Sequence, residues 1–302
     1  MRVLITGGTG LIGRRLITQL LKDSHDVSIL SRKSLKPAWM SSKVTFLQWD
    51  GKTAKGWGNH LEAVDAVVNL AGAGVADARW TDERKQLILN SRVNAGQAVV
   101  EAFAATENKP QVLIQASGVG YYGTDEEKTF TEADGPGDDF MADVCVQWEA
   151  STAPVEAMGV RRVIIRTGVV FDPEGGALPK LTMPFKFFAG GPLGSGRQWV
   201  PWIHYADAIG AILFLSENEA AHGPINLTAP QPVRNNELAQ AIGRVLGRPA
   251  LMPAPGLAVK MLVGEMAEAV LKGQRVMPMA LQQLGYTFQY PQIDPALRDL
   301  LK

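Results

Sequence analysis

Three glycines at positions 7, 10 and 13 stand between the first predicted strand and the first predicted helix of this 302-residue chain. The run RVLITGG is short and rich in β-branched residues, and LIGRRLITQLLKD follows it with apolar residues at helical spacing. In such a loop Gly7 allows a tight turn, Gly10 lets a phosphate approach the backbone, and Gly13 lets the helix pack closely on the sheet. Since the helix start also offers free N–H groups and a positive dipole end, the loop predicts a site for the pyrophosphate of a dinucleotide.

Strands and helices continue to alternate as far as about residue 170. The buried strands are apolar on both faces, which is typical of a parallel sheet covered by helices. We therefore expect an α/β fold built on a doubly wound parallel sheet of the Rossmann type. The pattern predicts strands over 2–8, 26–32, 44–50, 64–72, 110–118 and 161–171, and helices over 11–23, 81–105 and 140–153.

The composition changes after residue 171, where glycine, proline and aromatic residues become frequent. We expect residues 1–170 to form the dinucleotide-binding domain. Residues 171–302 are expected to form a smaller α/β part that covers the substrate, and the chain can cross back between the two. Within this second part, helical patterns cover 205–218, 235–249 and 256–273, and a short strand is predicted over 223–230.

Bulk composition excludes several classes of protein. Hydrophobic residues make up 46% and charged residues 20%, with zero formal net charge and no dense Lys/Arg block, so we expect a globular chain that binds no nucleic acid. The apolar run AIGAILFL is far too short to span a membrane, and MRVLITGG lacks the layout of a signal peptide. A single cysteine can build neither a disulfide framework nor a thiolate zinc site. We expect a cytoplasmic protein without a metal site.

The end of the second strand, SILSRKS, bears on the choice of cofactor. A site for NAD usually has an acidic residue there to bind the ribose 2′-hydroxyl, whereas this chain has Arg32 followed by Lys33. A guanidinium can bind a 2′-phosphate through two parallel hydrogen bonds, so the sequence favours NADP; a solvated basic turn is the alternative. The candidate cofactor-binding residues are Gly7, Thr9, Gly10, Leu11, Ile12, Gly13, Arg32, Leu70, Ala71 and Gly72.

The runs MRVLITGGTGLIG, AVVNLAG, ASGVGYYG, RTGVVF and WIHYADA together resemble the extended short-chain dehydrogenase/reductases of the NAD-dependent epimerase/dehydratase family. Further runs, RWTDERKQLILNSRV, VCVQWE and VLKGQRVMPMALQQLGYTFQYP, resemble an atypical branch labelled "epimerase family protein". The resemblance covers most of the chain. It implies a family-specific helical extension over about 250–300, a small-molecule substrate, and a homodimer as one option.

The same resemblance shows what is unusual here. The family carries out its chemistry with a Tyr and a Lys four residues apart on the helix after the fifth strand. The Tyr exchanges a proton with the substrate, and the Lys lowers the pKa of that Tyr. Aligning Glu149 with a glutamate common in the family places Cys145 at the Lys position and Met141 at the Tyr position. Cys145 is either a small buried residue or a thiol that contributes to binding or chemistry.

Other residues could supply the missing proton donor. Ser117 resembles the family's Ser/Thr that binds the substrate oxygen, although counting back from Tyr122 places Gly118 there instead. Tyr121 or Tyr122 could donate a phenolic proton, or either could simply pack the loop. The candidate catalytic residues are therefore Ser117, Tyr121 and Cys145.

Three further features are open to two interpretations each. Arg92 replaces an Asn that is usual in relatives, and it could bind an anion or stabilise its helix. The basic residues Arg79, Arg84 and Lys85 either border the cleft or form a solvated face. We expect His204 to be structural rather than a base.

Two functional hypotheses follow from these residues. The first is an NADP-dependent oxidoreductase or epimerase-like enzyme with a non-standard proton donor. The second is an NADP(H)-binding sensor or scaffold that has lost the chemistry.

Overall fold

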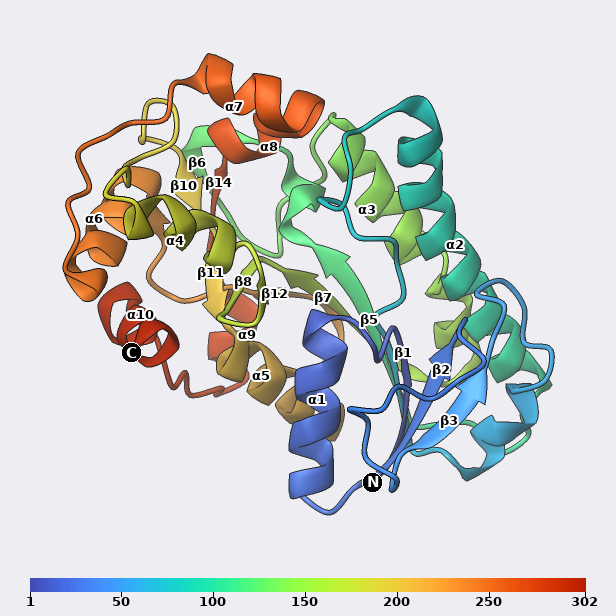
Figure 1. Ribbon diagram of the computed structural model, residues 1–302. Helices are drawn as coiled ribbons and strands as arrows, with labels where there is room; N and C mark the ends of the chain where they lie inside the picture. Colours follow the sequence, from blue (N-terminus) through green and yellow to red (C-terminus); the bar gives the residue numbers. More distant parts are fainter.

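The computed structural model describes the backbone of residues 1–302 and all side chains except those of residues 262, 263 and 269. Within this described backbone the main sheet has seven strands, and every neighbouring pair runs parallel (Figure 1). Their spatial order is β12 (Gly223–Leu227), β7 (Arg161–Thr167), β5 (Val112–Gly118), β4 (Ala66–Asn69), β1 (Arg2–Thr6), β2 (Asp26–Ser31) and β3 (Thr45–Gln48). The predicted doubly wound Rossmann-type α/β fold is therefore confirmed.

Helices cover both faces of this sheet, as side-chain alternation along β1 requires. Val3 and Ile5 of β1 point to the face covered by α1 (Leu11–Lys22) and α5 (Tyr205–Glu217). Leu4 points to the opposite face and packs in a second core with Val99 and Phe103 of α2 (Asp82–Ala105). Beside α2 lies α3 (Phe140–Ala150). Thr81 and Asp139 cap α2 and α3, each accepting a hydrogen bond from a backbone N–H three residues on.

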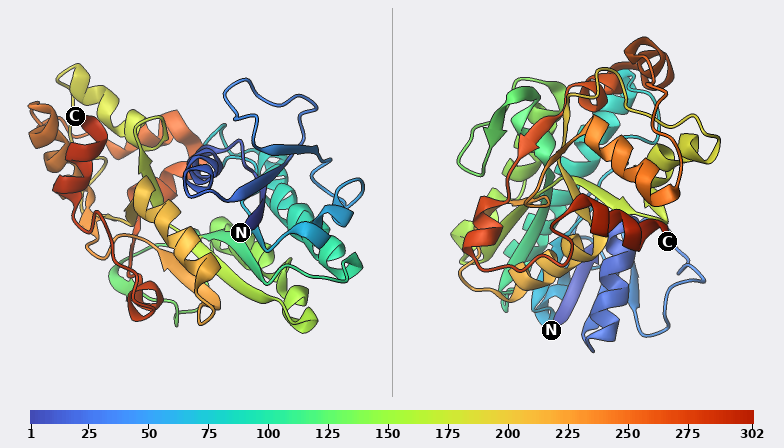
Figure 2. Two further views of the ribbon diagram at one scale, coloured as in Figure 1. Left: turned by 90° about the horizontal axis from the view of Figure 1, so that it is seen from below. Right: turned by 90° about the vertical axis from the view of Figure 1, so that its left-hand side faces the viewer.

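The remaining elements lie mainly to one side of the main sheet, as Figure 2 shows for the segments coloured yellow to red. They form three small sheets, β11-β8-β9, β10-β13 and β14-β6, and a third apolar core around Phe171, Phe185 and Trp202. The strands are β6 (Asp125–Phe130), β8 (Val169–Asp172), β9 (Gly175–Gly176), β10 (Trp199–Val200), β11 (Trp202–His204), β13 (Val233–Arg234) and β14 (Gln274–Val276). The helices are α4 (Leu178–Lys186), α6 (Asn235–Leu246), α7 (Gly256–Val263), α8 (Ala267–Leu271), α9 (Met279–Gln283) and α10 (Ile293–Leu301).

The predicted strand over 161–171 is wrong as a single element. The chain leaves the main sheet between β7 and β8 at Gly168, where a Cβ would overlap the Pro201 carbonyl oxygen. This close backbone approach lets β8 pair with β11 in a different sheet.

The predicted helix over 256–273 is also broken. Gly264 has a φ of 65°, in the left-handed region, and separates α7 from α8.

The chain crosses back between the two parts of the molecule. β12 extends the main sheet beside β7, and α5 packs on the same face of that sheet as α1. The division at residue 170 stays a prediction about folding units, but the sheet itself draws on residues from both sides of it.

Candidate functional site

The loop between β1 and α1 has the backbone geometry that an anion site needs. Gly7 has a φ of 69°, and a Cβ there would lie 2.6 Å from the Leu70 carbonyl oxygen. A Cβ on Gly13 would lie 2.5 Å from the Gly7 carbonyl oxygen. Gly10 caps α1 without a side-chain hydrogen bond, and the first turn contains no acidic residue. The N–H groups of this turn are therefore available to a ligand.

A cavity of about 510 Å³ opens beside this loop. Seven of the ten residues expected to bind the cofactor line it: Gly7, Thr9, Gly10, Arg32, Leu70, Ala71 and Gly72. The other three, Leu11, Ile12 and Gly13, lie in the first turn of α1, where the Leu11 side chain faces Gly175. The role of all ten in cofactor binding stays a prediction.

Sequence reasoning missed a second wall of this cavity. One face of α2 contributes Leu87, Asn90, Ser91, Asn94 and Ala95, and the segment after β3 contributes Trp49, Asp50, Gly51 and Lys52. The helical residues recur three or four positions apart, so the spacing of the polar residues in LNSRVN was a usable signal. The segment after β3 carries no such pattern.

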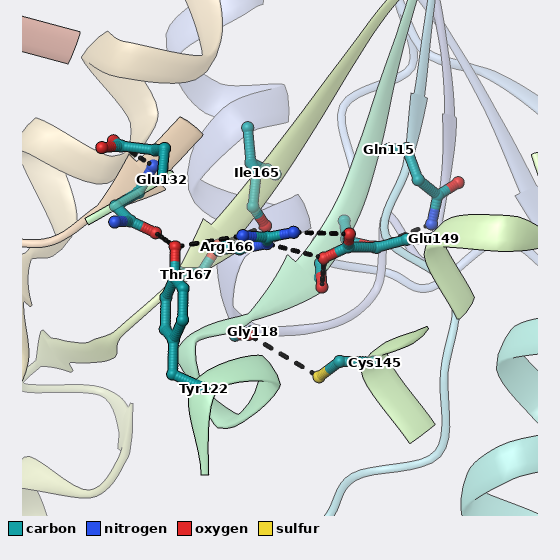
Figure 3. Close-up of polar contacts among 12 residues, drawn as sticks. Gln115, Gly118, Tyr122, Glu132, Cys145, Glu149, Ile165, Arg166 and Thr167 are labelled. Carbon is teal, nitrogen blue, oxygen red and sulfur yellow. Dashed lines mark hydrogen bonds and ion pairs between the residues drawn. The ribbon is translucent and has the colours of Figure 1, made fainter. Parts of the chain in front are cut away.

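Ser117, near the end of β5, belongs to a buried polar network with Glu149, Arg166 and Tyr122, and the last three are labelled in Figure 3. Its hydroxyl donates a hydrogen bond of 2.7 Å to Glu149 Oε1. Arg166 of β7 donates to both carboxylate oxygens of Glu149, with N–O distances of 2.9 Å, and through Nη1 to the Tyr122 hydroxyl at 3.1 Å. The interactions with Glu149 raise the pKa of Arg166 against the opposing effect of burial. The Ser117 proton is therefore engaged by a carboxylate.

Arg166 is the member of this network that sequence reasoning missed. An arginine directly after the apolar run VII of the strand RRVIIRT is the signal that could have identified it. A charged side chain on a buried strand needs a partner, and Glu149 is the acid that faces it.

The two adjacent tyrosines differ in environment. Tyr122 is buried, donates to Asn226 Oδ1 at 2.7 Å, and has its pKa raised to about 12 by burial. Tyr121 is half-buried, and its ring lies 3.4 Å from the Arg166 guanidinium carbon. Tyr122 is consequently part of the structural network, while Tyr121 lies nearer the surface.

Met141 and Cys145 lie on one face of α3 against the turn that follows β5. The Cys145 thiol is 3.6 Å from the Gly118 carbonyl oxygen, and a Cβ on Gly120 would lie 3.2 Å from Met141 Cβ. Cys145 is fully buried, and this burial raises the pKa of its thiol to about 11. At neutral pH it is a protonated thiol, which can donate a weak hydrogen bond and is a poor nucleophile.

Arg92 is a buried cation between the cavity wall and α3. Its Nη1 donates to the carbonyl oxygens of Ala73 and Ile88, at 3.0 and 2.8 Å, and its guanidinium lies over the ring of Trp148. Its Nε has no hydrogen-bond partner among the described residues. Burial lowers the pKa of Arg92 to about 10, an effect that Cys145 opposes only when its thiol is ionised. The structure thus places a cation near the position where the family has its lysine.

The remaining candidates have structural contacts. His204 is buried and accepts a hydrogen bond from the Ala206 N–H at the start of α5. Lys85 forms an ion pair with Glu265, and Arg79 donates to the Met261 carbonyl oxygen. The basic edge therefore contacts the C-terminal segment. Within the part of the chain that is described, no helix is long and apolar enough to cross a membrane, and no three His, Cys, Asp or Glu side chains are grouped as metal ligands.

Two family models match the chain. One, described as the NAD dependent epimerase/dehydratase family, matches residues 3–227, and the other, a domain of unknown function (DUF1731), matches residues 254–300. The epimerase family protein SA0724 of Staphylococcus aureus strain N315 is 40% identical over 301 residues, which cover 99% of this chain and 98% of the relative. The chloroplastic SDR39U1 homolog of Arabidopsis thaliana is 41% identical over 304 residues, with 100% and 87% covered.

A solved structure is similar over the same length. The crystal structure of human epimerase family protein SDR39U1 (isoform 2), determined with NADPH, has a TM-score of 0.89 and 33% identity, with 99% of each chain covered. Together with the family models, these full-length similarities show that the chain belongs to the NAD-dependent epimerase/dehydratase family and carries its C-terminal DUF1731 extension.

Proposed function

We propose that this protein binds NADP(H) in the cavity beside the β1–α1 loop and acts as an oxidoreductase or epimerase-like enzyme on a small polar substrate. The observation that carries the proposal is the joint lining of one cavity by the glycine loop and Arg32. A pyrophosphate fits the free N–H groups at the start of α1, and a 2′-phosphate fits the guanidinium. The human relative crystallised with NADPH supports the choice of cofactor.

The bound nicotinamide would supply two-electron redox chemistry, and the protein residues would supply orientation and protons. Ser117 donates its proton to Glu149, which Arg166 holds in turn, so the Ser117 oxygen has a defined position from which to accept a hydrogen bond from a substrate hydroxyl. Tyr121 lies over the Arg166 guanidinium and is only half-buried, so its phenolic hydroxyl is our candidate for proton transfer. Cys145 would contribute a buried, protonated thiol that supports the turn after β5 through the Gly118 carbonyl oxygen.

Cofactor binding is tested by titrating the protein with NADPH and NADH and following fluorescence and thermal unfolding. A ligand that binds only the folded state stabilises it by about 2.7 kcal/mol at a hundred times its dissociation constant, which is enough to rank the two cofactors. We expect NADPH to stabilise the protein more than NADH. Equal stabilisation by both would contradict the proposed NADP preference.

Catalysis is tested separately by following the absorbance of the protein–NADPH complex while carbonyl compounds and nucleotide sugars are added. Turnover that is lost in Ser117→Ala or Tyr121→Phe supports an enzyme with a non-standard proton donor. Met141→Leu serves as the control, because the thioether already lacks an exchangeable proton.

A sensor or scaffold is the second candidate. It is favoured by the protonated, buried thiol of Cys145 and by the engagement of the Ser117 proton with Glu149. A tight NADPH complex that turns over none of the compounds but changes the binding of another protein would support it.

A further inference from the structure

The cavity beside the glycine loop has a basic end formed by two segments that are distant in sequence. Arg32 and Lys33 follow β2, and Lys52 follows β3. The only acid among the residues that line this cavity is Asp50. The lining therefore carries an excess of two positive charges, which complements the charge of about −1.5 to −2 on a phosphate monoester at neutral pH.

Backbone contacts hold these two segments against one another. The Trp49 N–H donates to the Ser31 carbonyl oxygen at 2.8 Å, which extends the β2–β3 pairing by one residue. Gly51 has a φ of 82°, and a Cβ on it would lie 3.4 Å from Arg32 Cδ. The segment after β3 thus lies directly beside the Arg32 side chain.

Asp50 organises the turn that carries Lys52. Its Oδ1 accepts the N–H groups of Lys52 and Thr53, at 2.7 and 2.9 Å, and its Oδ2 accepts the Thr53 hydroxyl at 2.8 Å. Both carboxylate oxygens are therefore occupied within the turn. An acid that would otherwise repel a phosphate here serves to fix the backbone of the neighbouring lysine.

The buried indole rings of Trp49 and Trp57 anchor the same turn. The Nε1 atoms of Trp49 and Trp57 each donate to the Thr53 carbonyl oxygen at 2.8 Å, and the two rings pack edge to face. The backbone at Lys52 is consequently preorganised, so binding a ligand there requires only the ordering of the lysine side chain.

We propose that Lys52 is a specificity-determining residue that, together with the neighbouring Arg32, binds the phosphate monoester on the ribose of the cofactor. The inference rests on the proposed function, since it requires a dinucleotide in the cavity. It assigns a second phosphate-binding residue, on the segment after β3, in addition to the arginine at the end of β2. Arg32 provides a planar guanidinium that can donate two parallel hydrogen bonds, and Lys52 provides a flexible point charge.

The test compares Lys52→Ala with Lys55→Ala, a lysine three positions further along the same segment that is exposed and does not line the cavity. Dissociation constants are measured by titration calorimetry for NADPH, NADH, 2′,5′-ADP and 5′-AMP. We expect Lys52→Ala to weaken NADPH and 2′,5′-ADP by about tenfold or more, as for loss of a charge-assisted hydrogen bond, and to leave NADH and 5′-AMP unchanged. Lys52→Arg should restore most of the affinity for NADPH.

Each other outcome has a distinct meaning. If the parent protein prefers NADPH and Lys52→Ala behaves like Lys55→Ala, the role of Lys52 is overturned while the proposed function survives. Equal weakening of NADPH and NADH would also overturn it, because the lysine would then act on the pyrophosphate. If the parent protein binds no dinucleotide, both the proposed function and this inference fail.

Discussion

Arg166 and Glu149 form a two-point ion pair that joins β7 to α3, with Nε–Oε1 and Nη2–Oε2 distances of 2.9 Å (Figure 3). The two side chains are only 5% and 11% exposed. Burial of either charge alone would cost several kcal/mol, so each depends on the other. The same carboxylate accepts a hydrogen bond from the Ser117 hydroxyl. The ion pair that stabilises the fold therefore also fixes the position of a candidate catalytic group.

Removing one partner of this pair should be costly. We expect Glu149→Ala to lower the free energy of unfolding by about 3–5 kcal/mol, because it leaves Arg166 buried without a counter-charge. The matched control is Glu156→Ala, whose carboxylate pairs with Arg162 but is 53% exposed, and it should cost about 1 kcal/mol or less. Urea denaturation measures both. A loss at Glu149 no larger than that at Glu156 would contradict this account.

Local patterns were sufficient to predict the glycine loop and most strands of the main sheet, because these features depend on neighbours in the chain. The break at Gly168 was not predictable in this way, because its cause is a carbonyl group from Pro201, which lies 33 positions further along.

The residues of the candidate site were also only partly predictable from the sequence. Arg32 follows from its place at the end of a strand, whereas Lys52 enters the cavity through the turn at Asp50, which has no helical or strand period. The pairing of Ser117 with Glu149 spans 32 positions and depends on the packing of α3 against β5. Side-chain partners brought together by tertiary packing leave little trace in local sequence.

Cys145 should be unreactive in the folded protein. Its pKa is raised from its usual value of 9.0 to about 11, so the thiolate fraction at pH 8 is about a hundredfold lower than in the unfolded chain. Because this is the only cysteine, labelling with iodoacetamide reports on it alone. We expect slow labelling of the native protein and rapid labelling in urea. Rapid labelling of native protein would mean that the thiol is activated.

The glycine loop should not tolerate a methyl group at Gly13. A Cβ there would lie 2.5 Å from the Gly7 carbonyl oxygen and 2.6 Å from Gly8 Cα, and both are backbone atoms that cannot rotate away. We expect Gly13→Ala to lower the melting temperature and to abolish NADPH binding. Gly135→Ala is the control, since a Cβ there would meet nothing within 4 Å. Unchanged NADPH affinity in Gly13→Ala would show that the loop is not the pyrophosphate site.

His204 should make stability depend on pH below about 6.5. Burial lowers its pKa despite the nearby carboxylates of Asp299, Asp207 and Asp172. The unfolded chain therefore binds a proton at a higher pH than the folded chain, and the free energy of unfolding falls as the pH drops below 6.5. We expect the loss between about pH 7.5 and 5.5 to be smaller in His204→Asn, where asparagine can still cap α5. His222→Asn, at an exposed histidine, should leave the loss unchanged.

A lysine at position 145, where the family resemblance places the family's lysine, should not be tolerated while Arg92 is present. Arg92 is close enough to position 145 to interact with it electrostatically, so an ammonium there would place a second buried cation beside the first. We expect Cys145→Lys to be strongly destabilising, and Arg92→Asn to relieve much of that cost. Urea denaturation of the two single variants and the double variant gives the coupling free energy, which should favour the double variant by more than about 1 kcal/mol. Additive effects would mean that Arg92 does not cause the instability of a lysine at position 145, and would contradict this account.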